Sequence, residues 1–203
     1  RSESDEKAAM APQTTKTDPH PTRSAGFYAG VMPILPFESS LPTVGENVFL
    51  APSATLIGEV RIDEGVTIMF GAIVRADRAT ISVGSGSNLQ DNVVIHGDPG
   101  FPAAIGSHVS VGHGAIIHGA TVENNCLIGM GATVLNGAVI GEGSLIAAGT
   151  VVLEGTVVPP GSLVAGVPGK IRRSVSADEV AAIGENARTY QRLGASYREA
   201  SSS

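Results

Sequence analysis

Histidine is concentrated in one stretch of this chain, residues 94–119, which reads VIHGDPGFPAAIGSHVSVGHGAIIHG. Three of its four histidines, His96, His113 and His118, have the type and spacing that metal chemistry requires. Neutral imidazole is the commonest protein metal ligand, and three imidazoles with a water form a typical catalytic zinc set. A single histidine in a repeat is more often a corner residue than a metal ligand. Whether these three bind a metal therefore depends on how close together the repeat places them.

A six-residue period begins at Val44. Written from the first aliphatic residue, the repeats read VGENVF, LAPSAT, LIGEVR, IDEGVT, IMFGAI and VRADRA, and after a short break VGSGSN, LQDNVV and IHG. After an insertion, DPGFPAA, the period resumes at Ile105 and continues to Gly169, with one repeat, IHGAT, a residue short. Self-similarity at a fixed short period is the signature of a solenoid, in which each unit buries its face against its neighbours.

The residue types at each position indicate how a coil is built. The first position is almost always Val, Ile or Leu, and the fourth is often Gly, as tight corners with positive φ require. The fifth position is small, and we expect it to point inward with the first; its members include Ala54, Val60, Val66, Ala72, Val93, Ala115, Thr121, Cys126, Ala132, Ala138, Ser144 and Thr150. Cys126 is therefore interpreted as a small core residue rather than a nucleophile. Three corners close a triangle, so about eighteen residues make one coil and the repeats make about seven coils.

The coil places two histidines together. Ile95 and Ile117 begin repeats on the same face in successive coils, so His96 and His118 share an outward position about 4.8 Å apart, which suits two ligands of one ion. Arg75 occupies the same column one coil earlier.

His113 lies at a corner instead, five extended residues and about 15 Å from His118. Ligands of one zinc ion lie about 2 Å from it, so His113 must serve a neighbouring chain. With a triangular prism and cyclic symmetry, this predicts a homotrimer with three metal sites at subunit interfaces.

Composition excludes several other classes. The 203 residues carry a net charge of −6, so neither nucleic acid nor an anionic membrane is an expected partner. One cysteine excludes an internal disulfide framework and fits a reducing, cytoplasmic location, and no apolar run approaches membrane-spanning length. Aromatic residues make up only 4% of the chain, so the core must consist of small and β-branched side chains.

The two ends differ from the repeats. Residues 1–26 are polar, proline-rich and without period, and are predicted to be a disordered leader without an apolar signal segment. We assign residues 27–170 to the β-helix domain, with 27–43 an extended lead-in. In residues 171–203, Ser176 and Glu179 form a capping box, and Val180, Ile183, Ala187, Tyr190 and Tyr197 follow at roughly helical spacing. They predict a C-terminal helix packed on the β-helix, with a short tail.

The motif set resembles the gamma-class carbonic anhydrase family over about residues 27–200. The resemblance is carried by the hexads, Arg75-x-Asp77, Asn88-x-Gln90-Asp91, His96 and the His113–His118 pair in its GHGAIIHG frame. It implies an all-β solenoid, a left-handed parallel β-helix, assembled as a homotrimer with a metal at each interface. The ending VAGVPGKIRR is less specific, because hexapeptide acyltransferases carry similar ones.

The resemblance also implies roles for the remaining residues. The substrate would be carbon dioxide or bicarbonate, and the cofactor Zn²⁺, with Fe²⁺ or Co²⁺ as alternatives because imidazoles accept each. Gln90 would orient the metal-bound water or bicarbonate, with Asn88 further out and Tyr190 of the helix either at the site or only packed. Arg75, Asp77 and Asp91 are expected to be interface structure, with an Arg75–Asp91 pair across subunits.

One segment departs from the family pattern. The best-studied type carries an acidic loop after the first histidine, with a Glu that shuttles protons, whereas here GDPGFPAA offers only Asp98. Asp98 is therefore the candidate proton acceptor. Three functions remain open: a carbonic anhydrase or related metal hydrolase such as an acyl-CoA thioesterase, a hexapeptide acyltransferase dependent on coenzyme A, and a metal-binding structural subunit without turnover.

Overall fold

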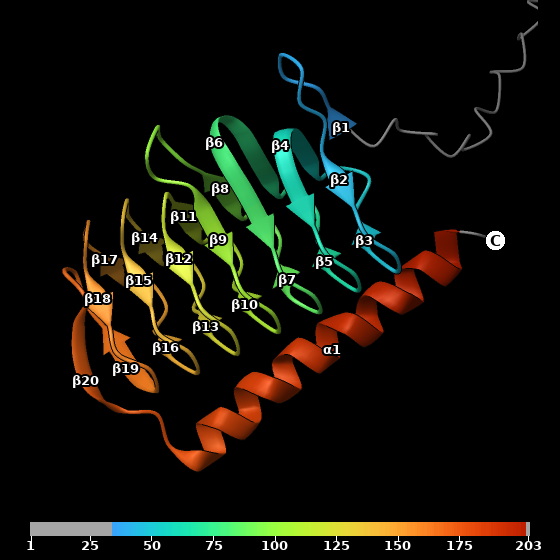
Figure 1. The fold of residues 1–203 in the computed structure, drawn as a ribbon. Coiled ribbons are helices and arrows are strands. Elements are labelled where there is room, and N and C mark those ends of the chain that lie inside the picture. The colour runs from blue at the N-terminus through green and yellow to red at the C-terminus, as the bar shows by residue number, and fades with distance from the viewer. Residues whose placement is uncertain (1–33, 202–203) are drawn as a thin grey trace, which may run out of the picture.

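The computed structural model describes residues 34–201, and the leader predicted at 1–26 lies outside that range. The chain forms a left-handed parallel β-helix of about seven coils with one C-terminal helix, which confirms the predicted fold class. Figure 1 shows the coils stacked side by side, with the helix running along the stack from the last coil back to the first.

Three strand faces make the prism. The helix face is an eight-stranded sheet that α1 (Ala177–Ser201) contacts, comprising β3 (Phe49–Leu50), β5 (Thr67–Ile68), β7 (Asn88–Leu89), β10 (Ser110–Val111), β13 (Leu127–Ile128), β16 (Leu145–Ile146), β19 (Ser162–Ala165) and β20 (Lys170–Ser174). All its pairings are parallel except β19 with β20, a closing strand that the sequence did not predict.

The other two faces belong to one twelve-stranded sheet. The histidine face contains β1 (Ile34–Leu35), β8 (Val94–His96), β11 (Ile116–His118), β14 (Thr133–Val134) and β17 (Val151–Val152). The third face contains β2 (Thr43–Val44), β9 (Ala103–Ile105), β12 (Thr121–Val122), β15 (Val139–Ile140) and β18 (Val157–Val158). Two long strands, β4 (Thr55–Ile62) and β6 (Ile73–Val83), bend around the corner and belong to both faces.

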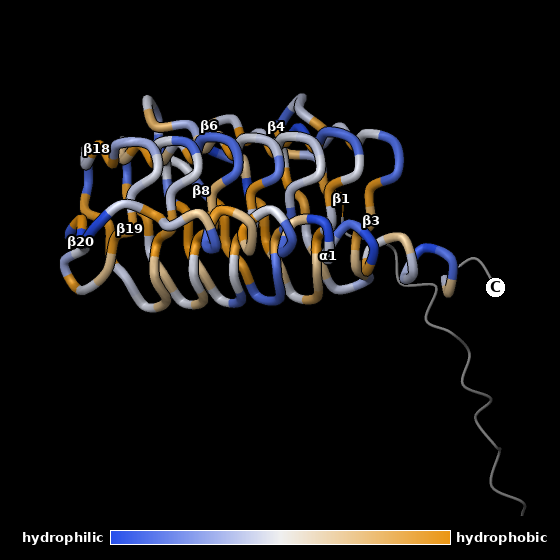
Figure 2. Tube along the Cα trace, turned by 90° about the horizontal axis from the view of Figure 1, so that it is seen from below, coloured by the Kyte–Doolittle hydropathy of each residue, from blue (hydrophilic) through white to orange (hydrophobic). Residues whose placement is uncertain are grey.

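The repeat positions explain this geometry. First-position residues such as Leu56, Ile95 and Ile117 are fully buried, and the tube in Figure 2 is apolar along the strands and polar at the corners. Most fourth positions have positive φ, usually at a glycine and elsewhere at residues such as Asn92, His108 and Asn125. Cys126 is fully buried, and burial raises the pKa of its thiol to about 11, as expected of an inert core residue.

Two position assignments were wrong. Thr121 is exposed and Ala120 is buried in its place, because the repeat IHGAT is one residue short and the inward position moves back by one. Val180 is 54% exposed, whereas Ile183 and Ala187, further along the helix, are buried.

The helix itself begins as predicted. The amide of Ser176 donates to the Glu179 carboxylate at 2.8 Å, and the Glu179 amide donates to Ser176 Oγ at 3.3 Å. Ile183 and Ala187 are buried, and the Tyr197 ring stacks on Phe49 with 4.9 Å between centroids. Among the described residues, no helix is long and apolar enough to cross a membrane.

Candidate metal centre

His96 and His118 lie side by side on adjacent strands. They are direct partners in the parallel register of β8 and β11, because Ile95 and Ile117 both begin repeats on this face. Nδ1 of His96 lies 3.0 Å from Nε2 of His118, and the ring centroids are 5.0 Å apart. Donors 2.0–2.1 Å from a tetrahedral zinc ion lie about 3.4 Å apart, so this spacing is close to that of two ligands.

The outer nitrogens of both rings meet oxygen acceptors. His96 Nε2 lies 2.9 Å from Asp77 Oδ1, and a carboxylate can only accept, so His96 carries its proton on Nε2. His118 Nδ1 lies 2.8 Å from Asn136 Oδ1, and the Asn136 amide is oriented by donating from Nδ2 to Asp98 Oδ2 at 3.1 Å. His118 must therefore carry its proton on Nδ1.

These tautomers direct two lone pairs at each other. With both protons on the outer nitrogens, His96 Nδ1 and His118 Nε2 are both acceptors, 3.0 Å apart. Two lone pairs at that distance repel each other unless a proton or a metal ion lies between them. Metal-binding histidines characteristically donate their other ring N–H to a carboxylate or a carbonyl oxygen, so this donor pair fits a divalent metal.

Asp77 links His96 to the neighbouring arginine. Arg75 follows Val74 on β6, in the column of His96 as expected, and its guanidinium donates to Asp77 Oδ2. Partial desolvation raises the pKa of Asp77, but the hydrogen bonds from His96 and Arg75 outweigh it, and the pKa is lowered overall. Asp77 is thus an anionic acceptor for His96, a contact that the sequence prediction of an interface role did not include.

Asp98 lies beside the same two histidines. His96, Asp98 and His118 each offer a ligand atom, and these atoms all lie within 4.8 Å of one another. The Asn136 hydrogen bond is the main cause that lowers the pKa of Asp98; partial desolvation opposes it, and the positive charge of Arg78 adds to it. Arg78 Nε lies 3.4 Å from Asp98 Oδ1.

Asn136 was missed by the sequence reasoning. It lies 18 residues after His118, but β11 and β14 pair at a spacing of 17 residues, Ile117 with Val134, because the repeat IHGAT is one residue short. Asn136 therefore lies one position beyond the residue that stacks on His118, and the hexad period alone did not identify it. It contacts both His118 and Asp98, and so couples a metal-ligand candidate to the nearby carboxylate.

His113 lies in a different group. Among residues 34–201, it is not part of the cluster of His96, Asp98 and His118. It precedes β11 at the corner with the helix face, whereas His118 ends β11 at the opposite corner. Its Nδ1 lies 2.8 Å from Asp91 Oδ2, which leaves Nε2 as the nitrogen able to bind a metal.

The remaining predicted residues gather around His113. Gln90 is buried, its Oε1 accepts from the His113 backbone N–H at 3.2 Å, and its Nε2 donates to Asn88 Oδ1 at 3.3 Å. The fully buried Asn88 donates in turn to Ser110 Oγ. The Tyr190 hydroxyl lies 3.4 Å from His113 Nε2, and burial raises the pKa of this phenol. The chain therefore carries two partial sites, one around His96 and His118 and one around His113.

The expected Arg75–Asp91 pair is not formed within one chain. Arg75 contacts Asp77, while Asp91 contacts His113 and accepts from the Phe70 backbone N–H at 3.2 Å. A pairing between subunits stays a prediction.

A cavity of about 390 Å³ opens beside His113. Gln90, His113, Asn186 and Tyr190 supply its polar lining, and aliphatic residues of β13 and β16 supply the rest. Asn186 Oδ1 is buried there without a hydrogen-bond partner among the described residues.

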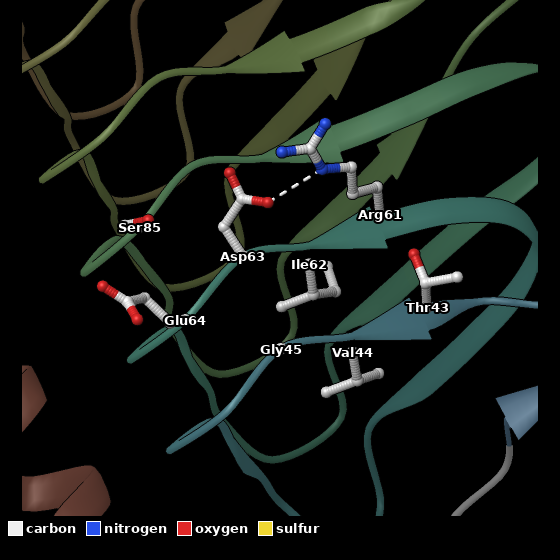
Figure 3. Close-up of a pocket in the computed structure, with 8 residues that line it drawn as sticks. All are labelled: Thr43, Val44, Gly45, Arg61, Ile62, Asp63, Glu64 and Ser85. Atoms are coloured by element: carbon white, nitrogen blue, oxygen red, sulfur yellow. Dashed lines mark hydrogen bonds and ion pairs between the residues drawn. The ribbon is translucent and has the colours of Figure 1, made fainter.

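A second hollow, at the first coils, is unrelated to the histidines (Figure 3). It is lined by Thr43, Val44, Gly45, Arg61, Ile62, Asp63, Glu64 and Ser85. Its exposed Arg61–Asp63 pair is an ordinary surface ion pair, so we assign this hollow no function.

Comparison with known proteins supports one family. A family model described as bacterial transferase hexapeptide (six repeats) matches residues 119–154. A protein of Methanocaldococcus jannaschii named probable carbonic anhydrase is 49% identical over 150 residues, covering 74% of this chain and 94% of that protein. The carbonic anhydrase of Geobacillus kaustophilus is 39% identical over 165 residues, covering 81% and 91%.

A plant relative and a solved structure are also similar to this chain. The mitochondrial gamma carbonic anhydrase 2 of Arabidopsis thaliana is 40% identical over 158 residues, and the match spans 75% of this chain but only 57% of that protein. A crystal structure titled putative acetyltransferase, from Bacillus cereus, superposes with a TM-score of 0.80 at 32% identity, covering 82% of this chain and 96% of that one. The hexapeptide β-helix, the histidine arrangement and these identities together establish that the chain belongs to the gamma-class carbonic anhydrase family.

Proposed function

We propose that this protein catalyses the reversible hydration of carbon dioxide to bicarbonate, as a homotrimer with a divalent metal site at each subunit interface. The observation that carries the proposal is the pair of imidazole nitrogens, His96 Nδ1 and His118 Nε2, whose lone pairs face each other at 3.0 Å. The relatives named carbonic anhydrase support the reaction class.

Three histidines would hold the metal. His96 Nδ1 and His118 Nε2 come from one subunit, and His113 Nε2 comes from its neighbour. In each ring the other nitrogen donates to an oxygen, of Asp77, Asn136 and Asp91 respectively, which fixes the orientation of the ring. Zn²⁺ is the proposed ion, with Fe²⁺ or Co²⁺ as alternatives, and when bound it would act as a Lewis acid that lowers the pKa of a water molecule.

The residues around His113 would orient the small reactants. Gln90 is held at both ends of its amide, by the His113 backbone N–H and by Asn88, so its position is fixed before a reactant binds. We assign Gln90 to hydrogen bonding with water or bicarbonate, and Asn88 to holding Gln90. Tyr190 lies against His113 and would complete the wall of the site.

Asp98 is the group available to accept a proton near His96 and His118. Its side chain is 39% exposed, so bulk buffer can reach it. The Asn136 hydrogen bond lowers its pKa, which makes it a weak base, and we therefore expect hydration to depend on the concentration of an external buffer.

Reassembly of two inactive variants tests the trimer. We expect His113→Ala and His96→Ala chains to be inactive alone and to regain activity when dissociated together and allowed to reassemble. Around any mixed trimer, one interface joins intact His96 and His118 to the intact His113 of the next chain. Each mixed trimer should therefore recover about one third of wild-type hydration activity.

Two results would contradict the proposal. If no mixture regains activity although both variants fold and wild type is active, the site is not shared between chains. If wild type loaded with zinc, or anaerobically with Fe²⁺, does not hydrate carbon dioxide in stopped-flow measurements, it is a structural subunit without turnover. Acyl transfer from acyl-coenzyme A without bound metal would favour the acyltransferase alternative, and metal-dependent hydrolysis of acyl-coenzyme A would favour the thioesterase alternative.

A further inference from the structure

We propose that a single chain already holds a complete three-donor metal site, formed by His96, Asp98 and His118, that needs no residue from a neighbour. The inference rests on the proposed metal binding at His96 and His118, but not on catalytic activity. In it, Asp98 and the neighbour's His113 are alternative third ligands of one ion.

The donor atoms lie within reach of one ion. His96 Nδ1 and His118 Nε2 are 3.0 Å apart, and one ligand atom from each of His96, Asp98 and His118 lies within 4.8 Å of the other two. Zinc–oxygen and zinc–nitrogen bonds of about 2.0–2.2 Å place tetrahedral donors about 3.4 Å apart. A rotation of the Asp98 side chain, which is 39% exposed, would close the remaining gap.

The backbone around Asp98 is held in place. Phe101 N–H donates to Asp98 O at 2.8 Å and closes a tight turn in which Gly100 has a φ of +85°. A Cβ at Gly97 would meet Phe101 O at 2.5 Å, so this turn packs directly on the chain just after His96. The Phe101 side chain in turn lies over Gly119 and Gly137 of the next coils. The short insertion thus fixes Asp98 against the histidine column.

The charges also suit a cation. Two neutral imidazoles and one carboxylate give a donor set with a single negative charge, a combination that Zn²⁺, Fe²⁺ and Co²⁺ all accept. Asn136 donates to Asp98 Oδ2 while it accepts from His118, so one amide orients two of the three ligands. Arg78, at 3.4 Å from Asp98 Oδ1, is the cation that a metal would displace.

The consequence concerns the order of assembly. A chain with its own three donors would take up metal before it meets its neighbours. On assembly, the incoming His113 would replace Asp98 and release the carboxylate to face solvent. Substitution of His113 should therefore weaken metal binding without abolishing it.

A double-mutant cycle tests this. Co²⁺ binding would be followed by visible absorption, and Zn²⁺ affinity by competition with a chromophoric chelator, in wild type, Asp98→Asn, His113→Ala and the double variant. We expect Asp98→Asn alone to bind almost as tightly as wild type. His113→Ala should still bind one ion per chain with an altered Co²⁺ spectrum, and the double variant should bind at least about tenfold more weakly than His113→Ala.

A matched control isolates the carboxylate. Asp63, which pairs with Arg61 on another part of the surface, would be changed to Asn in the His113→Ala background. This variant should keep the affinity of His113→Ala. Circular dichroism of every variant would verify that the β-helix is folded.

Three outcomes would overturn the inference. In the first, folded His113→Ala binds no metal although wild type does. In the second, the double variant binds as tightly as His113→Ala. In the third, the effects of the two substitutions are additive, so that Asp98 does not substitute for His113. All three leave the proposed three-histidine site intact, whereas failure of wild type to bind metal would reject both proposals.

Discussion

At the scale of single residues, hydrogen bonds set which nitrogen of each histidine is free for the proposed metal. Asp77, Asn136 and Asp91 each accept from one nitrogen of a histidine, which leaves Nδ1 of His96 and Nε2 of His118 and His113 as the nitrogens available to the proposed metal. Such partners fix the tautomer and the ring orientation, and their loss typically lowers metal affinity by about 10–100-fold.

Asn136→Ala should lower the metal affinity by about 10–100-fold, because His118 loses the acceptor for its Nδ1 proton. The matched control is Asn124→Ala, at another corner, where Asn124 Oδ1 accepts from the Ser107 backbone N–H at 2.8 Å and from no histidine among the described residues. Competition titration with Zn²⁺ would measure both. Equal affinities in the two variants would mean that Asn136 does not position His118.

At the scale of elements, the corners of the coil control the site as much as its strands do. Several corners carry a glycine with positive φ and open space where a Cβ would stand, as at Gly143, whose φ is +67°. Gly119, which directly follows His118, is different. A Cβ there would lie 2.2 Å from Asn136 Oδ1 and 2.8 Å from the Phe101 Cβ.

Gly119→Ala should therefore reduce metal affinity, because the added methyl group displaces Asn136 and the turn that holds Asp98. Gly143→Ala is the matched control, since it incurs the same left-handed backbone strain, about 1–2 kcal/mol, without meeting a neighbour. Thermal unfolding would measure the effect of the backbone strain in both variants. Titration with Zn²⁺ would measure their metal affinity. If both lose stability and neither loses affinity, the Gly119 corner has no part in positioning the ligands.

At the scale of the whole molecule, the two partial sites lie at opposite corners of the histidine face, one at each end of β11. A rigid prism of parallel strands cannot bring these corners together within one chain. The proposed three-histidine site would therefore need a second copy of the chain, and in that case metal binding and assembly should be thermodynamically linked.

Removal of metal by a chelator should lower the thermal midpoint of the wild-type protein. An ion at 100 times its dissociation constant contributes about 2.7 kcal/mol to a state that binds it, and this is lost on chelation. Sedimentation should show a species of about three times the 20.6 kDa chain with metal bound. A chain that sediments as a monomer with and without metal would contradict this linkage.

The sequence by itself determined the β-helix and the pairing of His96 with His118. Six-residue repeats with an aliphatic first residue can bury that residue in only one register, so residues one coil apart must stack. The same regularity placed Cys126 in the core and His113 at a distant corner. The capping box of Ser176 and Glu179 similarly fixed the start of the helix from local chemistry alone.

Only the tertiary structure decided the features that depend on irregular repeats and on side-chain reach. The short repeat IHGAT moved the inward position from Thr121 to Ala120, and the strand β20 formed where the period had ended. The contacts of Asp77, Asp98 and Asn136 with the histidines arise from a bent strand, an inserted turn and the following coil. A period fixes which backbone positions stack, but hydrogen bonds between side chains depend on distances of a few tenths of an ångström, which only the folded chain defines.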